Sequence, residues 1–378
     1  MKLKGLYLLT LAVLLSLVVI AYAADNDKLV PYRLLTTITI PNGLVGFDIS
    51  WVDSANARYY LANRGNATAT PPVPPEIDVI DTKHNKLLYS IPLTSAGNGV
   101  VAINGSTEEP DQPGVLVVGT ADSHALFIDL AHPQAAPIAV STNGNHRADE
   151  LAYDPLDRVI LIANDQDVPA PYVSFISTEA HAVVGKIVYD GTLGNPQSTG
   201  GIEQSVWDAA TRRFYISIPK TAANANGEID EINPSTMAIT KVFPTSAACG
   251  ARGGPAGLAL IPGQHLIASC GDVLDIASGS VLNVAGVSGD EIWFNSGDDR
   301  VYFAGGLDRI SMNVVSALSP FNVITSLTVG LIATPPAPNR TTHSVAADSQ
   351  LNRIFVPVSH EGVKVYTDDR DNGEGPDN

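Results

Sequence analysis

The chain has 378 residues, of which 39 are Asp or Glu and 22 are Lys or Arg, so its formal net charge is −17. This acidic balance excludes a protein that binds nucleic acid by neutralising phosphates. A hydrophobic content of 45% excludes an intrinsically disordered chain, and two cysteines are too few for a small disulfide-built scaffold. The length alone is typical of two or three domains.

The first 23 residues have the pattern of a secretory signal peptide. Two lysines precede an apolar run from Leu6 to Ile20, and Ala21–Ala23 is a small-x-small cleavage triplet. We therefore predict a signal peptide at 1–23 and a secreted or periplasmic protein that keeps no membrane segment after cleavage. An uncleaved N-terminal anchor is the alternative.

Five segments of the chain share one pattern: a short apolar strand, an Asp or Asn, a polar turn, an Arg, and a second β-branched or aromatic strand. They are Asp48–Asn63, Asp149–Asn164, Glu203–Pro219, Asp290–Gly305 and His343–Pro357. The pattern is typical of a β-hairpin in which the Asp or Asn binds the backbone of its own turn and the Arg clamps that carboxylate. Two looser units, Gly99–Thr120 and Ala256–Cys270, bring the number to seven.

A third strand and usually a fourth follow each unit, and seven units of about four strands describe a β-propeller. The last unit stops after its third strand, Gly362–Tyr366, whereas the N-terminal segment Tyr32–Ile40 is a strand without a partner. Placed as the outer strand of the last blade, this segment would close the ring and remove a free edge. We therefore predict one all-β domain, a seven-bladed β-propeller over 24–367, followed by an acidic disordered tail at 368–378.

Two features of the sequence resemble a known group of propellers. The third strand Ile77–Thr82 (IDVIDT) followed by Lys86–Ile91 (KLLYSI) resembles the YVTN repeat, and Asp149–Pro155 and Asp290–Asn295 resemble inner strands of secreted YncE-like propellers. These are related to the lactonase-like and SMP-30/gluconolactonase-like propellers. The resemblance covers nearly the whole mature chain and implies the fold, but the group includes hydrolases, a lyase and proteins without known activity. The metal-binding amides of the gluconolactonase-like branch and the paired histidines of the lyase-like branch are not matched here.

Alignment of the seven inner strands on their turn acids places one residue of each strand in a ring near one mouth of the central channel. The ring contains Asp48, Gly99, Asp149, Glu203, Ala256, Asp290 and His343, and the next ring contains Ile49, Val100, Glu150, Gln204, Gly257, Glu291 and Ser344. His146 is expected to approach the same rim. Carboxylates that converge repel one another unless protons, basic partners or a cation compensate them.

This donor set suits Ca²⁺, Mg²⁺ or Mn²⁺, and Zn²⁺ less well. The candidate metal ligands are Asp48, Asp149, Glu150, Glu203, Asp290, Glu291 and His343. The alternative is a set of structural acids around a water-filled channel.

Two functions follow from this ring. The first is an exported, monomeric protein that binds a divalent metal or a small ligand at the rim, or that serves as an interaction platform for another protein. The second is a metal-dependent hydrolase of lactones or esters, in which the ion polarises a carbonyl and acidifies water. Glu203, Asp290 or Glu150 would then be the general base, and His343 a ligand or acid–base partner.

Two further expectations concern the interior. Trp51, Trp207 and Trp293 fall on inner strands and are interpreted as core between blades, which disfavours a lectin. Cys249 and Cys270 lie at the rim side of the fifth blade and are predicted to form a disulfide, as an oxidising compartment allows. Two buried or free thiols are the alternative.

Overall fold

The structure is a computed structural model that describes residues 32–103 and 114–368. The predicted signal peptide and the predicted tail beyond Asp368 lie outside these residues. The chain divides into two units, Met1–Arg33 with Asp368–Asn378 and Leu34–Thr367, and the propeller is the second unit. Within the described part, no helix is long and apolar enough to cross a membrane.

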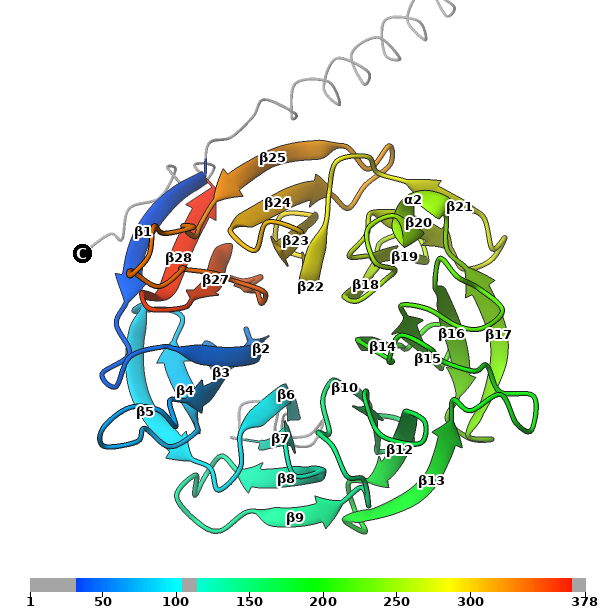
Figure 1. Cartoon of the computed structure of the whole chain (residues 1–378), viewed down its shortest axis with the longest axis horizontal. Helices are drawn as coiled ribbons and strands as arrows, with labels where there is room; N and C mark the ends of the chain where they lie inside the picture. Colours follow the sequence, from blue (N-terminus) through cyan, green and yellow to red (C-terminus); the bar gives the residue numbers. More distant parts are fainter. Residues whose placement is uncertain (1–31, 104–113, 369–378) are drawn as a thin grey trace, which may run out of the picture. The chain divides into compact units, whose positions relative to one another are not determined.

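Seven four-stranded antiparallel sheets form the blades of a β-propeller, which confirms the predicted fold (Figure 1). Blade 1 contains β2 (Gly46–Asp53), β3 (Arg58–Gly65), β4 (Glu76–Asp81) and β5 (Lys86–Pro92); blade 2 contains β6 (Gly97–Ile103), β7 (Val115–Thr120), β8 (His124–Asp129) and β9 (Ile138–Ser141). Blade 3 contains β10 (Leu151–Asp154), β11 (Val159–Asn164), β12 (Tyr172–Ser177) and β13 (Ala182–Val188); blade 4 contains β14 (Ser205–Asp208), β15 (Arg213–Ile218), β16 (Glu228–Asn233) and β17 (Ala238–Pro244). Blade 5 contains β18 (Leu258–Ile261), β19 (His265–Ala268), β20 (Asp272–Asp275) and β21 (Val281–Asn283); blade 6 contains β22 (Gly289–Asn295), β23 (Arg300–Gly305), β24 (Ser311–Ser316) and β25 (Val323–Thr328).

Blade 7 joins the two ends of the ring. It contains β26 (Ala346–Asp348), β27 (Arg353–Val358) and β28 (Gly362–Asp368), and β1 (Tyr32–Ile38) is its outer strand, in the order β1-β28-β27-β26. The predicted closure by the N-terminal strand is therefore confirmed. Gly362 permits the close approach of β28 to β1, because its φ is +128° and a Cβ there would overlap with the carbonyl oxygen of Ile38.

The predicted turn chemistry is present in the first hairpin of several blades. Asp154, for example, accepts hydrogen bonds from the backbone N–H groups of Leu156 and Asp157, at 2.8 and 3.2 Å. The arginine differs from blade to blade: Arg158 pairs with Glu179 and not with the turn acid. In blade 1, Arg58 Nη1 instead donates to two carbonyl oxygens of its own turn, at 3.2 and 3.0 Å, so there the arginine supports the hairpin together with the acid.

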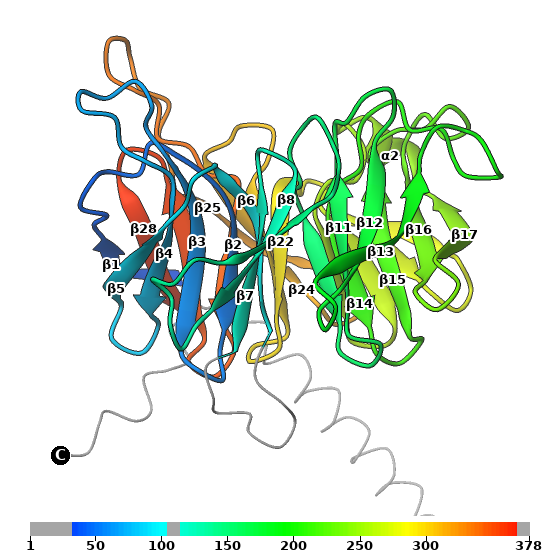
Figure 2. The ribbon, with the colours of Figure 1, turned by 90° about the horizontal axis from the view of Figure 1, so that it is seen from below.

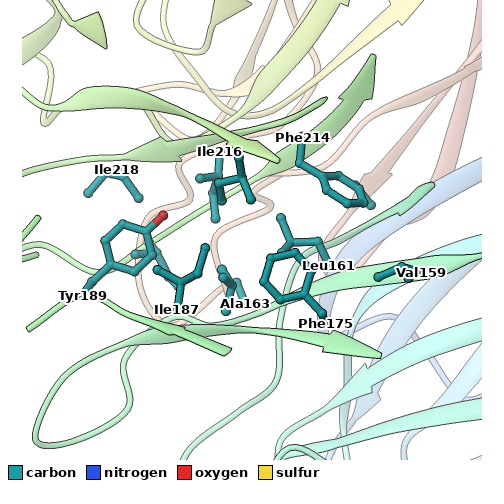
Figure 3. Packing of buried hydrophobic residues seen from close by; sticks show 13 residues of the cluster. Val159, Leu161, Ala163, Phe175, Ile187, Tyr189, Phe214, Ile216 and Ile218 are labelled. Carbon is teal, nitrogen blue, oxygen red and sulfur yellow. The ribbon is translucent and has the colours of Figure 1, made fainter. Parts of the chain in front are cut away.

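The hydrophobic core lies between neighbouring blades. In the cluster of Figure 3, Leu161 and Phe175 of blade 3 pack with Phe214 and Ile216 of blade 4, and all four side chains are fully buried. Figure 2 shows the sheets of the ring from the side, each next to the following one. Because each sheet buries both faces against its neighbours, strands such as β11 (VILIAN) are apolar at nearly every position. The ring is consequently one cooperative core rather than several domains.

Cys249 and Cys270 form a disulfide, as the sequence predicts, with Cα atoms 4.9 Å apart. Cys249 lies on the short helix α2 (Ala247–Gly250), and the side chain of Ser246 accepts a hydrogen bond from its backbone N–H. The disulfide bond holds α2, which precedes blade 5 in the chain, close to the end of β19, the second strand of that blade.

Candidate functional site

The candidate residues of the two rings meet at one mouth of the central channel. A cavity of about 200 Å³ there is lined by all seven predicted candidates together with three arginines. The lining consists of Asp48, Asp149, Glu150, Glu203, Asp290, Glu291 and His343, with Arg64, Arg147, Arg309 and Ile49. We call this cavity the acidic mouth. The alignment of the inner strands therefore placed the candidates correctly with respect to one another.

Gly99 and the strand that contains it explain how the acids come so close. A Cβ at Gly99 would overlap with the carbonyl oxygen of Asp149, so the inner strand of blade 2 lies directly against that of blade 3. The backbone of Asp149 is held on its other side by Ala163, whose carbonyl oxygen is 2.7 Å from the Asp149 nitrogen. The glycine brings no functional group of its own, but it fixes the position of an acid in the next blade.

Asp48 and His343 form a pair between blades 1 and 7. The His343 Nε2 and the Asp48 Oδ1 are 3.3 Å apart, and the imidazole stacks on the Phe47 ring with centroids 4.7 Å apart. Burial by itself would lower the pKa of His343, but the hydrogen bond and charge of Asp48, with the charges of Asp290 and Glu291, outweigh it and raise the pKa. His343 is therefore held toward its protonated form.

Arg147 organises the carboxylates on the other side of the mouth. Its Nη2 lies 2.8 Å from Asp149 Oδ2 and 2.7 Å from Asp165 Oδ2, and its Nη1 lies 3.6 Å from Asp48 Oδ2. Arg64 also pairs with Asp48. Burial acts to raise the pKa of Asp48, but the His343 hydrogen bond and the arginine charges prevail and lower it. This half of the mouth is thus neutralised from within the protein.

Glu203 and Asp290 differ from the other acids of the mouth. Their side chains make no hydrogen bond or ion pair among the described residues, and Asp290 is exposed. Burial, followed by the charges of Asp165, Asp290 and Glu291, raises the pKa of Glu203 well above its usual value. The side chains of these two carboxylates, one from blade 4 and one from blade 6, therefore lack hydrogen-bond partners, while the charges of nearby arginines and of His343 only partly oppose the rise in their pKa values.

Glu150 and Glu291 lie deeper and interact with each other. They come from blades 3 and 6, are only 4% and 7% exposed, and their carboxyl groups are within hydrogen-bonding reach of each other. Burial raises the pKa of both groups, to about 8 for Glu291. Since a hydrogen bond between two carboxyl groups requires a proton, the pair cannot be doubly ionised. We call it the carboxyl pair.

The geometry of the mouth does not match a preformed divalent metal site. In residues 32–103 and 114–368, the group of Asp, Glu, His and Cys ligand atoms lying within 4.8 Å of one another is Cys249, Cys270 and Asp272, whose cysteines are joined to each other. In the mouth, Arg64 and Arg147 occupy positions next to the carboxylates where an ion would need to bind. The mouth contains carboxylate and imidazole groups of the kind that bind metal ions. Arginine side chains lie among them, however, and the ligand atoms of these described residues do not converge on one point where an ion could bind.

The sequence reasoning missed the three arginines and a second role of the three tryptophans. Arg147 is two positions before Asp149, so the alternation of an extended strand puts the two on one side, a signal that could have identified it. His146, expected at the rim, is exposed and does not line the cavity. Trp51, Trp207 and Trp293 pack against cores of the propeller, as predicted, but they are only half-buried and also line a second cavity of about 430 Å³ farther along the channel.

Comparisons with known proteins identify the fold and nothing finer. No protein-family model matches the chain, and no curated protein matches it. Among solved structures, a chain of the "Crystal Structure of Mitotic Checkpoint Complex" is similar with a TM-score of 0.64, covering 89% of this chain and 91% of that chain at 11% sequence identity. At such low identity the likeness establishes the seven-bladed β-propeller alone. The chain is thus a β-propeller, a fold that supports either an interaction platform or an enzyme.

Proposed function

We propose that the protein is an exported binding protein that captures a small organic cation, such as an amine or a guanidinium compound, at the acidic mouth. The observation that carries the proposal is the pair of unpartnered carboxylates, Glu203 and Asp290, on two sides of a cavity of about 200 Å³. A cation that donates hydrogen bonds to both would relieve the repulsion among the acids. The net charge of −17 favours the approach of cations from solution.

An organic cation fits this mouth better than a metal ion does. An ammonium or guanidinium group makes directional hydrogen bonds to separate carboxylates and needs no single centre of coordination. Arg147 pairs with Asp149 and Asp165, so the carboxylates of the mouth that make no ion pair or hydrogen bond among the described residues are those of Glu203 and Asp290. Export is part of the proposal and rests on the N-terminal sequence, with which the Cys249–Cys270 disulfide is compatible.

The test is a calorimetric titration of the purified mature protein with methylammonium, guanidinium, putrescine, Ca²⁺, Mg²⁺ and Mn²⁺. We expect putrescine to bind most tightly, because its two ammonium groups can reach two carboxylates. Glu203→Gln and Asp290→Asn should each weaken this binding about tenfold, the loss of one charged hydrogen bond. Asp129→Asn, an exposed aspartate on β8, removes the same charge elsewhere and serves as the control.

Two outcomes would contradict the proposal. Binding of none of the organic cations would remove it, and stoichiometric binding of a divalent ion that both variants abolish would restore the metal site in its place. The metal-dependent hydrolase stays a prediction, and turnover of a lactone and ester panel by the same preparation tests it.

A further inference from the structure

The body of the central channel forms a second cavity, distinct in chemistry from the acidic mouth. It has a volume of about 430 Å³, is partly enclosed, and is lined by inner-strand residues of all seven blades. Its walls include Trp51, Trp207 and Trp293, which are all the tryptophans of the chain. The Trp51 and Trp293 rings meet edge to face with centroids 5.1 Å apart, although they come from blades 1 and 6. We call this cavity the aromatic chamber.

The carboxyl pair separates the aromatic chamber from the acidic mouth, because Glu150 and Glu291 line both cavities. Most other polar groups of the chamber wall already have partners within the protein. Gln204 Oε1 accepts a hydrogen bond from the Leu258 nitrogen at 2.6 Å, and the hydroxyls of two serines, one from blade 1 and one from blade 7, bind each other. Two residues of the wall differ: Trp207 Nε1 is buried without a hydrogen-bond partner among the described residues, and Glu291 Oε2 has no donor there apart from a protonated Glu150.

The apolar walls and the buried polar groups of the chamber together indicate what it accommodates. A buried polar atom loses free energy relative to water unless something supplies a hydrogen bond. The apolar walls favour a hydrophobic body, and aromatic rings bind such bodies with large contact area. Because the two carboxyl groups bind each other through a proton, the polar end of the chamber presents hydrogen-bonding groups instead of a full double charge.

From these observations we infer that the aromatic chamber is a binding site for a neutral amphipathic molecule, with an apolar body against the tryptophans and one hydroxyl, carbonyl or amide group at Glu291. The inference does not depend on the proposed function of the acidic mouth, because Glu203 and Asp290 do not line the chamber. The two sites take different ligands: a hydrophilic cation in the mouth and a neutral apolar molecule in the chamber.

The fluorescence of the protein provides a direct test, because every tryptophan lines the chamber. We would titrate the wild-type protein with benzyl alcohol, toluene and benzylammonium, which share a phenyl body and differ in the polar group. Benzyl alcohol is expected to change the tryptophan emission and to bind about tenfold more tightly than toluene. This difference corresponds to the free energy of one buried hydrogen bond. Benzylammonium is expected to bind more weakly than benzyl alcohol because its charge must leave water.

Variants assign the effect to residues. Glu291→Leu should make the affinities for benzyl alcohol and toluene equal, whereas Glu291→Gln, which keeps a neutral hydrogen-bonding group, should retain the tenfold preference. Glu179→Leu, on the exposed surface, is the matched control and should behave as the wild type. Trp293→Leu should weaken all three probes together. Calorimetry confirms each affinity where a variant changes the fluorescence itself.

Three results would overturn the inference: no saturable binding of benzyl alcohol, tighter binding of benzylammonium than of benzyl alcohol, or an unchanged preference in Glu291→Leu. Each leaves the putrescine titration of the acidic mouth unaffected, so failure of one site is distinguishable from failure of the other.

Discussion

Replacement of Glu291 by glutamine should change how the stability of the protein depends on pH. Burial raises the pKa of this carboxyl group to about 8 in the folded protein, against 4.5 as its ordinary value. Between these two pH values the folded chain binds one proton that the unfolded chain has released. The free energy of unfolding therefore decreases as pH rises, by about 1.4 kcal/mol per pH unit for this group.

Glutamine has the shape of the protonated acid and does not titrate. We expect Glu291→Gln and the wild type to have similar stability near pH 5, where the acid is protonated in the fold. At pH 8 the variant should be the more stable protein by roughly 4 kcal/mol, the sum of the slope over three pH units. Other buried acids contribute their own dependence to both proteins, but Glu150 interacts with residue 291, so the difference between the two proteins reports the titration of the carboxyl pair.

The assay is urea denaturation followed by far-ultraviolet circular dichroism at pH 5, 6, 7 and 8, which avoids the tryptophans near the substitution. Glu179→Gln removes an exposed carboxylate and should run parallel to the wild type at every pH. A difference between Glu291→Gln and wild type that stays constant with pH would refute the reasoning. So would a variant that loses stability at pH 8, since the ionised carboxylate would then be the form that the fold favours.

Two further predictions follow. Asp48→Asn should lower the pKa of His343, because it removes the hydrogen bond and the charge that raise it, and an imidazole titration by NMR that kept its midpoint would show that another group sets the pKa. Replacement of both Cys249 and Cys270 by serine should reduce the free energy of unfolding by about 3 kcal/mol, because the bond closes a loop with a sequence separation of 21. A loss of less than 1 kcal/mol in the same denaturation assay would contradict the loop-entropy argument.

The repeat in the sequence predicted the ring of acids because its spacing is measured from a turn. Asp154 binds its own turn, so the residues a fixed number of positions before such an acid lie at equal depth in every blade, as Asp149 and Asp290 do. Arg64 and Arg309 could not be predicted in this way, because Arg64 lies near the end of the second strand of its blade and Arg309 follows one, beyond the residues whose spacing from the turn is fixed.

The tryptophans illustrate a different limit of sequence reasoning. An inner strand has a neighbouring blade on each side and the channel in front, so alternation alone does not distinguish burial between blades from exposure to the channel. Trp207 shows both: it packs on the cluster between blades 3 and 4 and also lines the aromatic chamber. Whether a side chain is buried between blades or faces the channel depends on the direction of its strand with respect to the ring axis. That direction is fixed only when the blades assemble into a ring.

The closure inside blade 7 gives the ring a mechanical property. The two ends of the ring are β1 and β28, and only strand pairing within this blade joins them. Continuous chain spans every junction between blades, including that from β1 to β2, where Asp48 also contacts His343 and the hydroxyl oxygens of Ser50 and Ser344 are 2.9 Å apart. A pulling force on the two ends of the ring would therefore separate β1 from β28 before any junction between blades opens.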